Sequence, residues 1–155
     1  MNINWKKLLI LLAIPLAVGG LATLLSGGMD SYQVMNQPPL SPPGWVFPVV
    51  WTILYLLMGY ASYRVSESDA PKEDRTKALI FYGIQLFFNF LWPIVFFRLQ
   101  WYFAAFVLLL VLWAFIYITM YLFEPIDEPA QTLLIPYLLW VTFAGYLNLG
   151  VALLN

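Results

Sequence analysis

The sequence of 155 residues contains no cysteine and no histidine. Without cysteine, the chain lacks disulfides, thiolate metal sites, covalent haem attachment and thiol nucleophiles. Without histidine, it lacks the commonest metal ligand, the usual axial ligand of haem and the usual general base near neutral pH. The residues therefore give no support for conventional acid–base or nucleophilic catalysis, and no metal site is predicted.

Charge is also scarce, since charged residues make up only 10% of the chain and the formal net charge is -1. Such a balance gives no electrostatic basis for a nucleic-acid partner. Hydrophobic residues make up 63%, against roughly half in soluble domains. A globule of 17.8 kDa has too much surface to hide that fraction inside. The composition therefore predicts an integral membrane protein whose main partner is the lipid bilayer.

The apolar runs predict a single all-α domain over residues 1–155, with five transmembrane helices at about residues 8–26, 45–64, 78–97, 101–123 and 132–154. A helical span needs about 20 apolar residues. The first run follows Lys6 and Lys7 and could be a signal peptide, but no A-x-A-like cleavage site follows it, so we expect it to be retained. Residues 27–44 contain four prolines, which prevent a long helix and predict a loop.

Basic residues predict the orientation of these spans. With five spans, six of the seven basic residues fall on one side: Lys6, Lys7, Arg64, Lys72, Arg75 and Lys77. Only Arg98 falls on the other side. By the positive-inside rule, the N-terminus and the 65–77 loop are expected in the cytoplasm, with the proline-rich loop outside.

No ionisable residue lies in the middle of any predicted span. Ion-coupled carriers and proton pumps usually place such a residue there, because its change of charge is the coupling event. A proton-coupled transporter is therefore disfavoured, while a neutral carrier or a binding protein stays open.

Helical spacing places aromatic and carboxamide side chains on one face of each of three spans. The second span contributes Trp51 and Tyr55, the third Gln85, Asn89, Trp92 and Phe96, and the fifth Trp140, Phe143, Ala144, Leu147 and Asn148. If these faces converge, they form an uncharged box with flat walls for a flat, hydrophobic, partly polar ligand. The same pattern is also expected of a packed core in which the carboxamides join helices, and the residues alone do not separate the two.

Three sequence blocks resemble a known family. They are PPGWVFPVVWTILYLLMGYASY, QLFFNFLWPIVFF and PYLLWVTFAGYLN, in that order. They are similar to blocks of the tryptophan-rich sensory protein family, whose mitochondrial members are called translocator protein or peripheral benzodiazepine receptor. The resemblance implies a five-helix bundle with a ligand cavity closed by the long first loop. The short chain without histidine or cysteine suggests a bacterial member, in the cell (inner) membrane.

The resemblance also implies a function and a set of site residues. Ligands of the family are porphyrins such as protoporphyrin IX and haem, sterols, isoquinoline carboxamides and benzodiazepines, so porphyrin is expected as a ligand and no cofactor is required. Carried over by position, the ligand-binding residues are Tyr32, Pro42, Pro43, Trp51, Asn89, Trp92, Trp140, Phe143, Ala144 and Leu147. Trp51 and Trp140 resemble the redox-active residues of light- and oxygen-dependent protoporphyrin degradation. The alternative is passive transport of porphyrins or sterols across the membrane.

Two positions depart from the family pattern. Leu40 stands where the family often has Trp, before the paired prolines. Leu149 and Leu153 stand where the mammalian sterol motif needs Tyr and Arg, so a cholesterol role does not follow from that motif. A homodimer stays open, because Gly19-Gly20 permits close helix approach but no strict GxxxG motif lies within a span.

Overall fold

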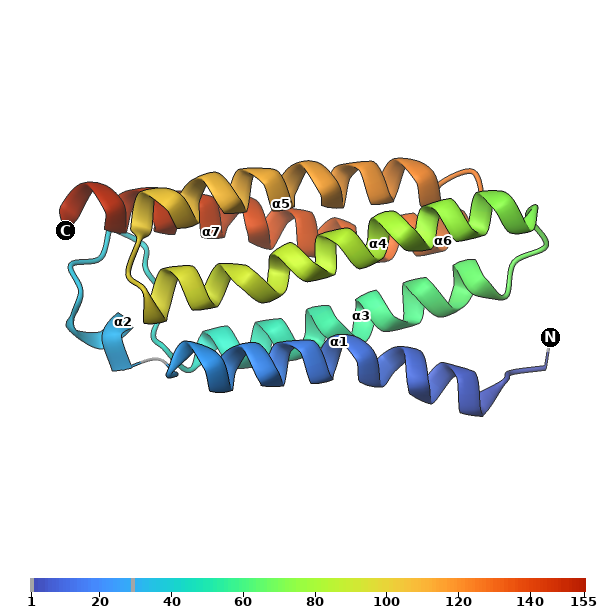
Figure 1. The fold of residues 1–155 in the computed structure, drawn as a ribbon, viewed down its shortest axis with the longest axis horizontal. Helices are drawn as coiled ribbons and strands as arrows, with labels where there is room; N and C mark the ends of the chain where they lie inside the picture. The colour runs from blue at the N-terminus through green and yellow to red at the C-terminus, as the bar shows by residue number, and fades with distance from the viewer. Residues whose placement is uncertain (1, 29) are drawn as a thin grey trace.

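A computed structural model describes residues 2–28 and 30–155, in which the regular secondary structure is all helical, without a β-strand. Five helices are long and apolar enough to cross a membrane, which confirms the all-α, five-span prediction (Figure 1). They are α1 (Trp5–Ser26), α3 (Val46–Ser66), α4 (Lys72–Pro93) continued by the π-helical η1 (Ile94–Arg98), α5 (Tyr102–Phe123), and α6 (Glu128–Leu133) followed by α7 (Ile135–Leu154). The short helix α2 (Asp30–Val34) lies in the first loop.

Three of these spans begin earlier than hydropathy predicts, and the first does so at Trp5 rather than at residue 8. Helix α4 begins at Lys72 rather than at residue 78, directly after Pro71, with Glu73 and Asp74 in its first turn. Acidic side chains in a first turn are favoured by the helix dipole. The last span begins with α6 at Glu128, where Asp127 caps the helix by accepting from the Ala130 N–H. Acidic side chains at the start of α4 and the Asp127 cap of α6 therefore favour helix beyond the apolar stretches that mark the bilayer.

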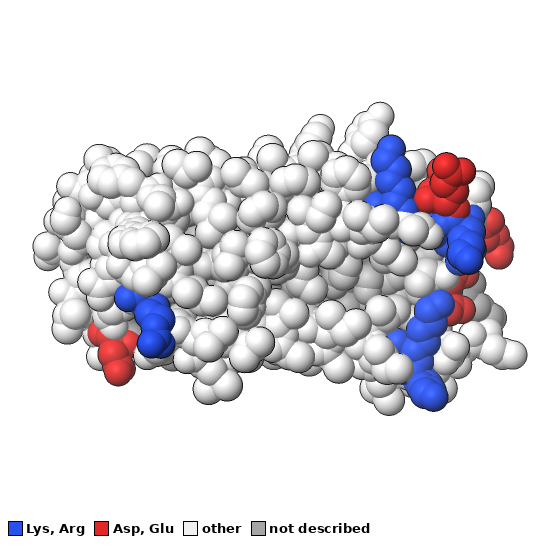
Figure 2. Space-filling view, viewed as in Figure 1, with Lys and Arg blue, Asp and Glu red and all other residues white. Residues whose placement is uncertain are grey.

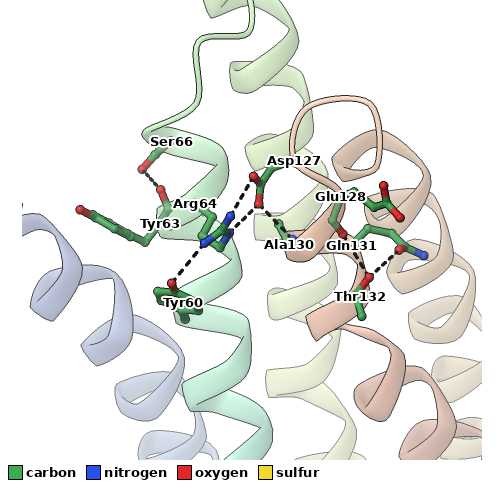
Figure 3. A network of polar contacts seen from close by, with 9 residues as sticks. All are labelled: Tyr60, Tyr63, Arg64, Ser66, Asp127, Glu128, Ala130, Gln131 and Thr132. Atoms are coloured by element: carbon green, nitrogen blue, oxygen red, sulfur yellow. Dashed lines mark hydrogen bonds and ion pairs between the residues drawn. The ribbon is translucent and has the colours of Figure 1, made fainter. Parts of the chain in front are cut away.

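The termini lie at opposite ends of the bundle (Figure 1). Figure 2 shows most of the charged side chains visible in that view gathered at the end where α1 begins and α3 meets α4. At this end Lys7 pairs with Glu67 at 2.8 Å. Arg64 pairs with Asp127 at 2.7 Å and also donates to the Tyr60 hydroxyl (Figure 3). These contacts join α1, α3 and the start of α6.

Helices α1 and α3 pack closely because glycines leave room for backbone and rings. A Cβ at Gly59 of α3 would lie 2.7 Å from the Leu11 carbonyl oxygen and from Leu12 Cα. Pro15 has no N–H, so the carbonyl of Leu11 lacks its usual helical donor where Gly59 approaches. On α1, a Cβ at Gly19 would meet the ring of Tyr55. Both contacts pack α1 against α3, and the second lies in the wall of the candidate site.

The first loop covers the opposite end of the bundle and is held to α7 and to itself. The Tyr146 hydroxyl donates to the Pro39 carbonyl at 2.6 Å, and the Asn36 N–H donates to Oδ1 of Asn155 at 3.1 Å. Within the loop, the Tyr32 hydroxyl donates to the Pro42 carbonyl at 2.7 Å. The loop is therefore tied down on the end that the site faces.

Candidate functional site: an aromatic cavity between α1, α3 and α4

A partly enclosed cavity of about 330 Å³ lies between α1, α3 and α4, near the end covered by the first loop. Its lining is mostly apolar and contains no charged side chain. The walls come from Gly19, Ala22, Thr23 and Ser26 of α1, Gly28 of the loop, Phe47, Pro48, Trp51 and Tyr55 of α3, and Asn89, Trp92, Pro93 and Phe97 of α4 and η1. Its volume falls at the lower end of the range for small-molecule sites, about 300–1,000 Å³.

Local sequence explains how these walls are placed. On α3, Trp51 and Tyr55 are one turn apart, and their rings stack with centroids 5.6 Å apart. On α4, Asn89 and Trp92 share the buried face. Pro93 interrupts the helical hydrogen bonds there, and the following π-helical turn changes the direction of the next side chains, so that Phe97 also reaches the cavity. A run of ordinary helix would place residue 97 on a different azimuth.

A chain of four buried hydrogen-bonding side chains begins at the cavity wall. The Tyr55 hydroxyl donates to Oδ1 of Asn89 at 2.9 Å, and Nδ2 of Asn89 donates to the Tyr137 hydroxyl at 2.8 Å. The Tyr137 hydroxyl in turn donates to Oε1 of Gln85 at 2.6 Å. The chain therefore links α3, α4 and α7 across the centre of the bundle.

A second polar bridge lies closer to the loop. The Trp92 indole N–H donates to Oδ1 of Asn148 at 2.9 Å, and Nδ2 of Asn148 donates to the Tyr102 carbonyl at 2.8 Å. Asn148 is thus satisfied on both sides by α4 and α5. In this arrangement it joins helices, as buried carboxamides commonly do in membrane proteins.

The predicted site residues fall into three groups. Trp51, Asn89 and Trp92 line the cavity. Tyr32, Ala144 and Leu147 line a much smaller cavity of about 10 Å³ on the α7 side of Trp92, and the two cavities share the walls Phe47, Trp92 and Phe97. Trp140 and Phe143 belong to neither lining; Trp140 packs edge-on against Phe47, with ring centroids 5.8 Å apart, and against Phe143.

The loop residues contribute unequally. The Tyr32 ring packs edge-on against Phe47 at 5.0 Å, and burial raises the pKa of its hydroxyl, which stays a neutral donor to Pro42. Pro42 is thus fixed through its carbonyl, whereas Pro43 is exposed and precedes the turn that opens α3. The lid is therefore held by Tyr32 more than by the prolines themselves.

Sequence reasoning placed Trp140, Ala144 and Asn148 on one line and did not single out Tyr137. Positions eight apart on a helix of 3.6 residues per turn differ by about 80° in azimuth. The buried face of α7 instead runs through Tyr137, Val141, Ala144 and Asn148. Helical spacing could have identified Tyr137, because Ala144 and Asn148 follow it by about two and three turns and so lie on the same face of α7. The contribution of α1, through Gly19 and Ala22, had no comparable signal apart from the Gly19-Gly20 pair.

Among residues 2–28 and 30–155, no three or more His, Cys, Asp or Glu side chains lie together in a group that could hold a metal ion. What the site does offer is flat aromatic surface, a few neutral hydroxyl and carboxamide groups and exclusion of charge. This arrangement suits non-covalent binding of a flat apolar molecule.

Comparison with known proteins identifies the fold's family. Residues 9–154 match the family model described as TspO/MBR. The chain belongs to the TspO/MBR family. It is 40% identical over 155 residues to a tryptophan-rich sensory protein of Cereibacter sphaeroides, covering 100% of this chain and 95% of the relative. It is 37% identical to the tryptophan-rich protein TspO of Chlorobaculum tepidum, covering 100% and 99%.

The relatives extend to mammals. The translocator protein of Bos taurus is 35% identical over 122 residues, which cover 78% of this chain and 72% of the relative. Together with five apolar spans, membership of the TspO/MBR family makes this chain a multi-pass membrane protein with a role of the receptor or transporter type.

Proposed function

We propose that this TspO/MBR member is a membrane receptor that binds porphyrins, such as protoporphyrin IX or haem, in the cavity between α1, α3 and α4. The observation that carries the proposal is the pair of stacked rings, Trp51 and Tyr55, facing Asn89 and Trp92 in a chamber without charge. Flat π-systems gain contact by stacking on such walls. Isoquinoline carboxamides and benzodiazepines are flat and partly polar as well, and the same walls suit them.

The size of the cavity adds a mechanical requirement. A macrocycle that exceeds about 330 Å³ needs more room than the main cavity offers. The small cavity lined by Tyr32, Ala144 and Leu147 adjoins it behind Phe47 and Phe97. Rotation of these two rings would join the two spaces and extend the site toward the loop. Ala144, being small, leaves the recess that the enlarged site would use.

We further propose that light and oxygen degrade bound protoporphyrin with help from Trp51 and Trp140. Trp51 lies in the cavity wall, where its indole would contact a bound macrocycle and could reduce the excited porphyrin, with O₂ as the oxidant of the overall reaction. Trp140 is one ring removed, behind Phe47. This step is supported by the positions of the two indoles, one in the cavity wall and one directly behind it.

Titration of the purified protein with protoporphyrin IX, followed by quenching of tryptophan fluorescence, tests the proposal. We expect saturable quenching, retained in Trp51→Phe and Trp140→Phe, while illumination in air degrades porphyrin more slowly in both variants than in the parent. Trp45→Phe, an exposed indole outside the cavity, is the matched control. Absence of saturation in the parent would exclude the receptor, and parent-rate degradation in both variants would exclude the redox role alone.

A second candidate, passive carriage of porphyrins or sterols, draws support from the position of α1. This helix supplies one wall of the cavity, yet most of its residues are not buried. Movement of α1 would open the cavity to lipid. Porphyrin uptake into proteoliposomes separates the two candidates. A carrier gives net movement of porphyrin into the vesicle interior, whereas a receptor binds only an amount proportional to the protein present.

A further inference from the structure

The chain of hydrogen bonds that begins at Tyr55 has a direction. All its donors point the same way along the chain, from Tyr55 to Asn89, from Asn89 to Tyr137 and from Tyr137 to Gln85. Tyr55 and Asn89 line the cavity, whereas Tyr137 and Gln85 do not. The chain therefore has a cavity end, where the Tyr55 proton is already used, and an inner end at the Gln85 carboxamide.

The inner end carries an unmatched donor. Gln85 is 1% exposed, and its Nε2 has no hydrogen-bond partner among residues 2–28 and 30–155. The Tyr82 hydroxyl, one turn earlier on the same buried face of α4, has none among these residues either. An unpaired buried donor is costly, more so in a low-dielectric interior. In this direction of the chain, the free-energy cost of an unpaired donor therefore falls on Nε2 of Gln85.

Turning over two carboxamides reverses the chain without breaking it. A 180° rotation of the terminal amide exchanges the oxygen and the NH₂ group of Asn89 or Gln85 in place. Gln85 then donates to Tyr137, Tyr137 to Asn89, and Asn89 to Tyr55, so all three contacts are kept. The unmatched inner group becomes a carbonyl oxygen, which tolerates an empty lone pair better than an N–H does. At the cavity end, the Tyr55 proton is released toward the ligand.

We propose that Tyr55 determines which ligands this cavity prefers, by donating to a hydrogen-bond acceptor on the ligand when the Asn89–Tyr137–Gln85 chain reverses. This inference rests on the proposed function and names the ligand class more closely: flat apolar molecules that carry a carbonyl, ester or carboxylate oxygen at the edge. A ligand without an acceptor leaves the chain in its resting direction. Gln85, which lies outside the cavity, acts through the chain and is a positioning residue.

The proposal makes opposite predictions for the two ends of the chain. Tyr55→Phe removes the donor and keeps the ring. Gln85→Met removes the inner acceptor, so the Tyr137 hydroxyl must turn to Asn89, and the chain is held in the direction that frees Tyr55. A substitution remote from the ligand should therefore strengthen the preference for acceptors, which loss of packing alone would not do.

The probes are mesoporphyrin IX dimethyl ester, which has ester carbonyls and no net charge, and etioporphyrin, which has only alkyl groups on the same macrocycle. The measured quantity is the ratio of the Kd of etioporphyrin to the Kd of the ester, for the full-length protein in detergent. We expect Tyr55→Phe to lower this ratio about 3- to 10-fold, the size of one net hydrogen bond. Gln85→Met should raise it severalfold, and Tyr121→Phe, an exposed tyrosine on α5, should leave it unchanged.

Folding is checked by thermal melting, and Gln85→Leu replaces Gln85→Met if the latter fails to fold. An unchanged ratio in Tyr55→Phe, or an unchanged or lowered ratio in the Gln85 variant, overturns the inference while porphyrin binding stands. If neither porphyrin saturates the parent protein, the proposed function fails, and the inference falls with it. A lowered ratio in Tyr55→Phe together with a raised ratio in the Gln85 variant supports it.

Discussion

Single glycines decide how closely α1 and α3 approach, and one of them, Gly19, lies in the lining of the cavity. Gly59 meets the backbone of α1 at Leu11 and Leu12, which cannot move aside as a flexible side chain could. Gly19 meets a ring, that of Tyr55, in the cavity wall. Gly20 on α1 faces open space. Neighbouring glycines of one helix thus have different roles, which only their tertiary contacts reveal.

We expect Gly59→Ala to destabilise the protein, because the new Cβ would lie 2.7 Å from backbone atoms of α1. Overpacking of this kind costs about 1–3 kcal/mol. Gly20→Ala is the matched control and should not destabilise, since nothing lies within 4 Å of its Cβ. Thermal melting in one detergent measures both. A melting temperature of Gly59→Ala equal to that of Gly20→Ala would contradict the close packing of α1 on α3.

The sequence predicted the position of some site side chains and not of others. The depth of Trp51, Asn89 and Trp92 followed from helical spacing, and the structure places all three in the cavity wall. Trp140 shares that spacing with Asn148 only loosely, so the two lie on different parts of α7. The hydrogen-bond partners could not be predicted from the sequence, because they are far apart along the chain. The Tyr137 hydroxyl bonds to Asn89, at a separation of 48 residues, and to Gln85, at a separation of 52.

At the scale of elements, the turn between α5 and α6 is fixed by one carboxylate with two tasks. Asp127 accepts from the Arg64 guanidinium through both oxygens, at 2.7 and 3.3 Å, and it caps α6 by accepting from the Ala130 N–H at 3.1 Å (Figure 3). Asp127 thus links α3 to the start of the last span, across 63 residues of the chain.

The two tasks of Asp127 are separable by substitution. Asp127→Asn keeps a capping oxygen and loses the charge, which for a partly exposed pair is worth about 1 kcal/mol or less. Asp127→Ala loses the cap as well, worth a further ~1 kcal/mol. We therefore expect melting temperatures to fall in the order parent, Asn variant, Ala variant, with Glu124→Gln, an exposed carboxylate of the same turn, close to the parent. Equal melting of all four proteins would contradict this assignment.

At the scale of the whole molecule, the five spans place the termini at opposite ends, with most charge at the end where the chain begins (Figures 1 and 2). We propose that this charged end faces the cytoplasm, by the positive-inside rule. The cavity then lies nearer the outer face, below the first loop. Ligand would enter from the outside or from the outer leaflet.

Because the chain contains no cysteine, single cysteines report this orientation directly. Gln33→Cys places a thiol on the exposed surface of α2 in the first loop, and Asp69→Cys places one in the α3–α4 loop. A membrane-impermeant maleimide should label the first variant from outside the cell and the second only after the membrane is opened or inverted. Labelling in the opposite pattern would reverse the topology and the route of ligand entry.

The sequence by itself determined that the chain lies in lipid, how many spans it has and that their centres carry no charge. Hydropathy is a sum over neighbouring residues, so it can be read without knowing any tertiary contact. Only the tertiary structure decided which helices enclose the cavity. In it α1 forms one wall of the cavity, and Trp140 packs behind Phe47 outside the lining. Hydrogen bonds connect four side chains in one chain: Tyr55, Asn89, Tyr137 and Gln85. The physical reason is that azimuth and crossing angle depend on how whole faces fit together, which spacing along one helix does not record.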